Sequence, residues 1–158
     1  MATDKERDRI DGLMRHIDHV RNNCVVLGER LISNGNPIGR ILIANGFIHD
    51  NSKFYGIEWE YLTDRTQDPE LMKAAVKQHN TTNPHHPEYW GSISAMPSIY
   101  MAEMVCDWAA RSSEFGTSLQ DWINDGAAKR FGYEKDSDVH MKICLYAGML
   151  CEKPFNSL

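Results

Sequence analysis

The sequence predicts an all-α protein, a compact single-domain bundle of five to six helices. Apolar residues recur at steps of three and four over most of the chain, which is the spacing of one face of an α-helix. No segment shows the sustained alternation of apolar and polar residues that is typical of strands joined by hairpin turns. Proline and glycine stand between the periodic segments, where they end one helix and begin the next.

The first predicted helix begins at a capping box, in which Thr3 and Glu6 bind each other's backbone N–H groups. The Ser-Asn-Gly-Asn-Pro segment at 33–37 ends it. Pro37 fits the first turn of a second helix, because a residue there has no helical partner for an N–H group. This second helix is predicted to run to about residue 50.

An irregular aromatic stretch at 54–62 precedes a third predicted helix, which begins at Asp68-Pro69 and runs to His79. The Asn-Pro-His-His-Pro segment at 83–87 then interrupts all regularity. Each proline disfavours the helical conformation of the residue before it. We therefore expect a fixed loop in this segment.

Two further helices and a C-terminal one complete the prediction. Pro97 and Gly116 have the positions of a helix start and a helix stop. Ser118 and Asp121 suggest the cap of a helix that continues through the apolar residues after them. The last helix is predicted between residues 139 and 150.

Composition and charge exclude several classes of protein. The 158 residues, 42% hydrophobic and 25% charged, fit one globular domain over 1–158, and no repeat or linker divides it. The net charge of −5 without a basic run argues against a nucleic-acid partner. The polar amino terminus and the lack of a long apolar run argue against a signal peptide or membrane span, so we expect a cytoplasmic protein. The oligomeric state is not predicted.

The cysteines predict neither a disulfide framework nor a cysteine-rich zinc site. No two of them form a C-x-x-C pair, and each lies within an apolar helical pattern. Buried free thiols in a reducing compartment are the expected interpretation. The residues concerned are Cys24, Cys106, Cys144 and Cys151.

The histidines are the most informative feature of the sequence. Most of the seven lie at predicted helix ends or in loops, where side chains from separate elements can converge on a cation. Imidazole nitrogen together with carboxylate oxygen suits Fe, Mn, Co, Ni or Zn better than Mg or Ca. A single histidine is more often structural, and His140, which has no partner motif, is interpreted so. The others are His16, His19, His49, His79, His85 and His86.

The order of these residues resembles a known family. His16, the pair His49-Asp50 and Asp107 follow one another as in the HD-domain superfamily of metal-dependent phosphohydrolases. The His-Asp-Asn-Ser-Lys segment ending at Lys53 is similar to an element of many members. The segments 83–90 and 103–108, which contain HHPEYW and EMxxDW, resemble an uncharacterised bacterial and phage subgroup. The resemblance covers about residues 13–110.

The resemblance implies one or two divalent transition ions. His16, His49 and Asp107 would hold mainly one ion, Asp50 could bridge, and His79 with a loop histidine would hold the other. Because the prolines extend the loop, we expect the side chains of its two histidines, His85 and His86, to diverge, and the sequence does not choose between them. The helical wheel places His16 beside the apolar face and His19 further out, which favours His16 as a ligand.

Two aspects of the pattern concern orientation around the ions. His49 and Asp50 would point about 100° apart on a helix, so both serve one site only if the helix ends there or if they face two metals. Glu103, one turn before Asp107, could orient a ligand or lie on a helix surface. Glu88 is a candidate carboxylate for orienting a histidine or for general acid catalysis.

Three residues are candidates for substrate contacts, and each also has a structural explanation. Lys53 could neutralise a substrate phosphate, or form an ion pair with Glu58. Arg111, four residues after Asp107, could bind an anion, or lie on a solvated helix face. Trp90 and the neighbouring aromatic residues could stack on a base, although such residues more often belong to a core.

These features predict a metal-dependent phosphoric ester hydrolase that acts on a nucleotide or another small phosphorylated substrate. Water activated at the ions would attack phosphorus. Two alternatives remain: a di-iron oxygenase of the HD type, and a non-catalytic metal- or nucleotide-binding module. The metal and the substrate are not determined by the sequence.

Overall fold

A computed structural model describes residues 3–62 and 68–153 of the chain, and these form an all-α domain with no β-strand among them. Short 3₁₀ turns lie at Asn51–Phe54, Pro87–Trp90 and Ile93–Ala95, and π-helical turns at Glu58–Leu62 and Trp122–Gly126. The α-helices are α1 (Asp4–Ser33), α2 (Ile38–Ile48), α3 (Pro69–Thr82), α4 (Ser98–Phe115), α5 (Leu119–Asp121), α6 (Ala127–Phe131) and α7 (Asp138–Cys151). None of the described helices has the length and hydrophobicity needed to cross a bilayer.

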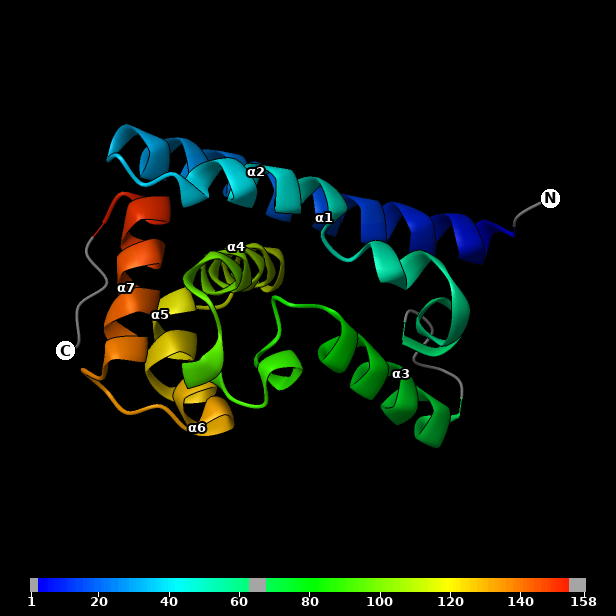
Figure 1. Cartoon of the computed structure of the whole chain (residues 1–158). Coiled ribbons are helices and arrows are strands. Elements are labelled where there is room, and N and C mark those ends of the chain that lie inside the picture. Colours follow the sequence, from blue (N-terminus) through cyan, green and yellow to red (C-terminus); the bar gives the residue numbers. More distant parts are fainter. Residues whose placement is uncertain (1–2, 63–67, 154–158) are drawn as a thin grey trace.

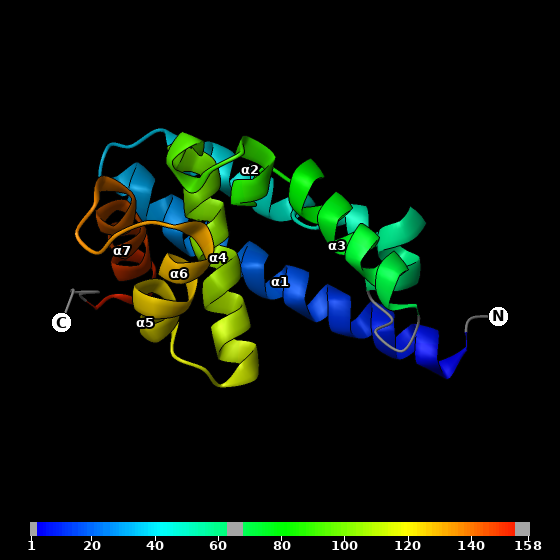
Figure 2. The same ribbon diagram turned by 90° about the horizontal axis from the view of Figure 1, so that it is seen from below.

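The helices pack around α4. The long α1 and α2 lie side by side and together cover one side of α4 (Figure 1). α7 and the α5–α6 segment lie on one side of α4, and α3 lies on the opposite side (Figures 1 and 2). The loop that follows α3 therefore returns the chain towards α4.

The all-α prediction is confirmed, with seven α-helices in the described residues instead of five or six. The difference arises because the helix expected after Ser118 is divided. A π-helical turn over Trp122–Gly126 separates α5 from α6. The indole of Trp122 packs directly on Gly126, where a methyl group would overlap the ring. The small residue thus allows the wider turn.

The predicted capping signals agree with the observed helix ends. Thr3 accepts a hydrogen bond from the backbone N–H of Glu6, whose carboxylate accepts one from the backbone N–H of Thr3 at 2.7 Å. Ser118 caps the start of α5 by accepting from the N–H of Asp121. Gly116 ends α4 in the left-handed conformation, with φ of 64°. These contacts satisfy backbone groups that a helix leaves unpaired at its ends.

α4 forms the centre of the hydrophobic core. All six residues from Met101 to Cys106 are buried, because α1, α2 and α7 pack around this helix. The expectation of buried thiols is correct for Cys24 and Cys106. It is wrong for Cys151, which is exposed at the end of α7, and Cys144 is only half-buried.

α1 and α2 approach each other closely at glycines, and the tightest contact joins Gly28 and Gly39. A methyl group built on Gly39 would overlap the carbonyl oxygen of Gly28, and one built on Gly28 would overlap the side chain of Ile43. Backbone atoms cannot move aside as a flexible side chain can. This contact therefore determines how near α2, which ends at the histidine cluster, lies to α1.

We expect Gly39→Ala to lower the free energy of unfolding by about 1–3 kcal/mol, because it forces the two helices apart. Urea denaturation measures the effect. Gly12→Ala is the matched control, since a methyl group there meets no atom within 4 Å. That control should gain about 0.5–1 kcal/mol from the better helix propensity of alanine. Equal effects of the two substitutions would contradict the close contact.

Candidate metal centre

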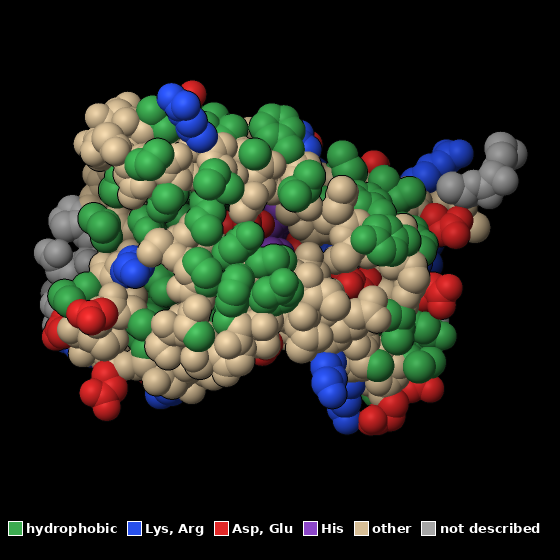
Figure 3. All heavy atoms as spheres, viewed as in Figure 1, with side chains coloured by type: hydrophobic (Ala, Val, Ile, Leu, Met, Phe, Trp, Pro, Cys, Tyr) green, Lys and Arg blue, Asp and Glu red, His purple; other side chains and the backbone are tan. Residues whose placement is uncertain are grey.

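Histidine and aspartate side chains from three helices, from the segment after α2 and from one loop meet in the interior. A small part of the histidine cluster is visible in a hollow near the middle of one face (Figure 3). Most of the cluster is buried, whereas His86 and Asp107 are partly exposed. Its members are His16 from α1, His49 and Asp50 after α2, His79 from α3, His85 and His86 from the loop, and Asp107 from α4.

The end of α2 explains how His49 and Asp50 serve one centre. The helix ends at Ile48, and His49 has an extended backbone with ψ of 133°. Asp50 is in the left-handed region with φ of 57°, which aspartate tolerates better than most residues. Neither residue is helical, so the two side chains do not diverge as they would on a continuing helix.

The two carboxylate oxygens of Asp50 face two different groups of histidines. Oδ2 lies 3.6 Å from Nε2 of both His16 and His49. Oδ1 lies 3.2 Å from Nε2 of His79 and 3.4 Å from Nε2 of His85. A carboxylate in this position can contribute one oxygen to each of two ions.

Three groups of described side chains could hold an ion. The group of His49, His85 and Glu103 shares its histidines with the other two groups, which have no residue in common and are called the two ligand sets here. In each set the ligand atoms lie within 4.8 Å of one another, and Nε2 of His16 is 3.2 Å from Oδ1 of Asp107. Atoms bound to one ion at about 2.0–2.2 Å are separated by roughly 3–4 Å, so the distance between His16 and Asp107 suits a first-row ion. The sets are His16, His49 and Asp107, and Asp50, His79, His85 and His86.

Unpaired polar atoms provide the test of whether a cation fits. Ten buried side-chain nitrogen or oxygen atoms of the described residues lack a hydrogen-bond partner, and six of them belong to this cluster. Each such atom costs about 1–3 kcal/mol when nothing compensates it. A divalent ion in each set would bind these atoms, which are Nε2 of His16, His49, His85 and His86 and Oδ1 of Asp50 and Asp107.

Glutamates orient the histidines from outside. Each of three imidazole rings has Nδ1 within hydrogen-bond distance of a carboxylate, which favours the tautomer that leaves the Nε2 lone pair facing inward. Such carboxylates fix the ring and raise its basicity as a ligand. The pairs are His16 with Glu114 at 2.9 Å, His49 with Glu103 at 3.0 Å, and His79 with Glu58 at 2.8 Å.

Of these glutamates, only Glu103 was predicted from the sequence to orient a ligand. It also accepts a hydrogen bond from Asn45 and lies 3.4 Å from Nδ1 of His85. Glu114 was missed, although it stands two helical turns after Asp107 and the spacing places both on one face. Glu58 lies in the irregular stretch, where no periodicity indicates direction.

The carboxylates at the centre keep their charge although they are buried. Burial disfavours the ionised form of Asp50, but electrostatic interactions with His49 and Lys53 outweigh it and hold the pKa of this carboxyl well below its usual value. For Glu103, burial is likewise outweighed by His49 and His85, and the pKa is lowered to about 2. The cluster therefore presents negative charge to a cation.

His85 and His86 have opposite electrostatic environments. Burial alone lowers the pKa of His85, but its contacts with Asp50 and Glu103 outweigh burial and raise the pKa to about 10. His86 has a pKa lowered to about 2 by burial and by the charges of His85 and His79. The expected divergence of the two loop side chains is wrong, because their ring centroids lie 4.3 Å apart.

Lys53 lies against the centre. Its 3₁₀ turn follows Asp50 directly, and its buried ammonium donates a hydrogen bond to Oδ2 of Asp50. The alternative ion pair with Glu58 is wrong, because Glu58 binds His79 and accepts a hydrogen bond from Ser52 at 2.7 Å. A fixed cation thus stands next to the carboxylate that separates the two histidine groups.

Two other predicted residues have contacts that do not involve the histidines. Glu88 accepts hydrogen bonds from Asn80 at 3.3 Å and Arg130 at 3.1 Å, so the described contacts do not give it the expected orienting role. Trp90 donates from its indole nitrogen to the carbonyl of Pro84 at 2.8 Å and packs against the core. It braces the histidine loop from behind.

The remaining predicted residues lie at the margin of the centre or away from it. Arg111 is 41% exposed and pairs with Glu114 at 3.2 Å, beside the cavity that Asp107 also lines. His19 is partly exposed, with Nδ1 3.5 Å from Glu114. His140 lies in a separate part of the core and contacts Asn124 at 2.9 Å.

Residues 5–147 match DUF5662, which is described as a family of unknown function. The chain belongs to this family. The match runs from α1 into α7, so the DUF5662 region contains all the ligand candidates and the glutamates that orient them. No curated protein and no solved structure matches the chain.

We expect DUF5662 protein purified without chelator to carry close to two equivalents of a first-row transition metal per chain. Asp50→Ala should remove most of it, because the set of His79, His85 and His86 loses its only carboxylate and the oxygen that faces His16 and His49 is lost as well. Elemental analysis of the purified proteins measures this. His19→Ala is the control, since His19 is outside both sets. Unchanged metal content in the Asp50 variant would show that the ligand assignment is wrong.

Glu58→Gln should weaken metal affinity by about 10- to 100-fold, because a neutral amide orients and polarises His79 less well than a carboxylate. Competition with a chelating dye gives the affinity. Glu70→Gln on α3 is the matched control, because Glu70 is exposed and pairs only with Lys73 among its described contacts. If both variants bind metal like the wild type, Glu58 has no orienting role.

Proposed function

We propose that the protein is a metal-dependent phosphohydrolase that acts on a nucleotide or another small phosphoester. The observation that carries this proposal is the position of Asp50, whose two oxygens face two sets of nitrogen ligands while Lys53 stands beside it. Two adjacent ions with a nearby cation suit in-line displacement at phosphorus. The order of His16, His49-Asp50 and Asp107, which resembles that of the HD-domain superfamily, also supports it.

The ligand sets define what each part of the chain would contribute. His16, His49 and Asp107 would hold one divalent ion, and Asp50, His79, His85 and His86 the other. Asp50 could contribute its second oxygen to the first ion, because Oδ2 lies 3.6 Å from Nε2 of both His16 and His49. When bound, such ions lower the pKa of water and stabilise charge on a phosphoryl group. In the reaction, a bond forms between phosphorus and a water oxygen, and the bond from phosphorus to the leaving oxygen breaks, which releases an alcohol and phosphate.

Charged side chains outside the ligand sets would bind the phosphate. A hollow of about 340 Å³ next to the centre is lined by Lys53 and Arg9, together with His16 and Asp8. The Lys53 ammonium is rigidly held, since it is buried and hydrogen-bonded to Asp50. A cation held in position in this way can balance the charge that develops on the transferred group without reorganising.

Lys53→Met tests the catalytic part of the proposal. The loss of the ammonium should reduce turnover by about 10²- to 10³-fold, whereas metal content should change little because a protonated amine has no lone pair for a metal. Phosphate release from a panel of nucleotides and small phosphoesters, with Mn, Co or Fe, gives the rate. Lys77→Met on the exposed side of α3 is the control.

The same preparations distinguish other chemistry. Uptake of O₂ by the iron-loaded protein without phosphate release would support an oxygenase with the same ligand residues and would reject hydrolysis. Absence of both signals, with metal bound, would support a binding module. Phosphate release that is unaffected by Lys53→Met would retain the hydrolase and remove the role given to the ammonium.

A further inference from the structure

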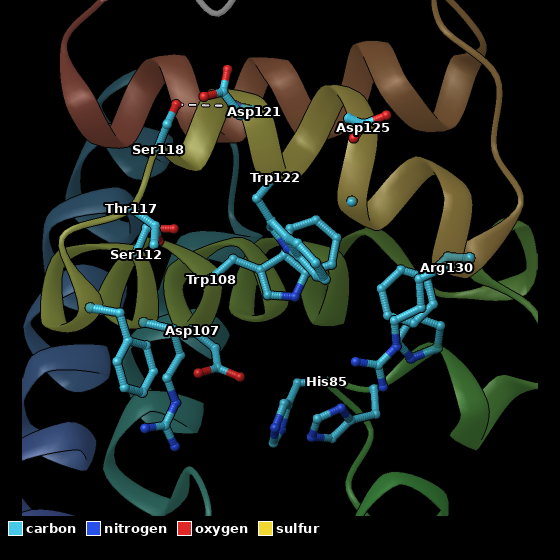
Figure 4. A pocket seen from close by; sticks show the side chains of 16 residues that line it. His85, Asp107, Trp108, Ser112, Thr117, Ser118, Asp121, Trp122, Asp125 and Arg130 are labelled. Atoms are coloured by element: carbon cyan, nitrogen blue, oxygen red, sulfur yellow. Dashed lines mark hydrogen bonds between the residues drawn. The ribbon is translucent and has the colours of Figure 1, made fainter.

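A cavity of about 610 Å³ lies beside the metal centre, between α4 and the segment that runs from α5 to α6. Its volume is in the range of small-molecule sites. In Figure 4 the indoles of Trp108 and Trp122 lie between the α5–α6 segment and the side chains of Asp107 and His85, whereas Asp121 lies further out. Most of the wall comes from residues after 107, beyond nearly all of the HD-like motifs.

The cavity and the candidate metal centre share residues. His85, His86 and Asp107 line the cavity, and each belongs to one of the two ligand sets. A phosphate bound at the ions would therefore have its ester substituent directed into this space or into the smaller cationic hollow. The larger cavity is the one with room for a ring. The residues of its walls indicate which kind of ring it suits.

Aromatic side chains dominate the part of the cavity away from the ligands. The rings of Trp108 and Phe131 are nearly parallel, with planes 11° apart and centroids 5.8 Å apart. Trp122 meets Trp108 edge to face at 5.8 Å. These three rings also pack against the core, but Phe115 lines the same cavity and is 68% exposed. Core packing does not account for an aromatic residue in that position.

Three of the charged side chains of the cavity have ion-pair partners. Arg111 pairs with Glu114 at 3.2 Å, Arg130 with Glu88 at 3.1 Å, and Asp125 with Lys129 at 2.7 Å. The aromatic walls and paired charges favour an uncharged planar group. They do not favour additional phosphates, which would need cations of their own.

We propose that this cavity binds the aromatic ring of the substrate, and that the substrate is a phosphomonoester with one phosphate at the metal centre and a planar aromatic substituent. The inference rests on the proposed hydrolase function for its catalytic part. The ring site itself depends only on the walls contributed by α4 and the segment from α5 to α6.

Two matched esters test the preference for a planar ring. Benzyl phosphate and cyclohexylmethyl phosphate share the CH₂–O–phosphate linkage and differ in the ring. With metal-loaded protein we expect kcat/KM to be about 3- to 10-fold higher for benzyl phosphate, which is the usual advantage of an aromatic contact. Calorimetric Kd values for the corresponding phosphonates, which are not hydrolysed, should differ by a similar factor.

Variants locate the preference in the cavity. Phe115→Ala and Trp122→Leu should each reduce the benzyl preference to less than half of its wild-type value. Phe115 is exposed, so its variant should fold normally, and circular dichroism checks both proteins. Phe47→Ala is the matched control, because Phe47 on α2 is also exposed, at 57%, and does not line this cavity. It should retain the full preference.

The two readouts separate failure of the ring site from failure of the hydrolase. Hydrolysis of both esters at equal efficiency, with equal phosphonate affinities, would overturn the ring site and leave the hydrolase. Preferential binding of benzylphosphonate without phosphate release would support the ring site and reject hydrolysis. A preference that persists in both cavity variants would overturn the assignment to this cavity, and absence of binding and hydrolysis would overturn both proposals.

Discussion

The charge of Asp50 is the constraint on which the centre depends. This carboxylate is almost fully buried, and burial would expel or neutralise it unless cations or donors surrounded it. The structure supplies Lys53 and four imidazoles from separate elements. The end of α2 at Ile48 and the left-handed backbone of Asp50 are needed to direct the carboxylate inward. Asp50 keeps this uncommon backbone conformation because the groups that surround its carboxylate hold it in place.

The glutamates outside the histidines join the centre to the fold. The contact of His16 with Glu114 joins α1 to the end of α4. The contact of His49 with Glu103 joins the residue after α2 to the first half of α4. The same groups that orient ligands therefore hold helices together. A weakened ligand contact and a loosened helix pair are consequently expected to occur together. This explains why a centre without hydrophobic residues can lie inside the core at little cost once cations are bound.

Much of the fold could be predicted because helix ends carry local chemical signals. The capping box at Thr3 and the glycine at 116 needed no knowledge of tertiary contacts. The π-helical turn at Trp122 could not be predicted, since it depends on packing between an indole and Gly126. The histidines and aspartates of the centre were selected by their order, whereas Glu58 lies in an irregular segment whose direction only the folded chain determines. The sequence likewise could not show that Lys53 pairs with Asp50 instead of Glu58, because the choice depends on where the three side chains lie in the folded chain.

The distribution of the two ligand sets along the chain has a consequence for biosynthesis. Asp50, His79, His85 and His86 lie between α2 and the loop after α3, so a ribosome completes this set before it makes α4. The other set needs Asp107, and the orientation of His16 also needs Glu114. A nascent chain thus contains all the ligands of one half of the centre while the other half is still incomplete. An ion held by the first set would take none of its ligands from α4, whereas an ion held by the other set would need Asp107 from that helix.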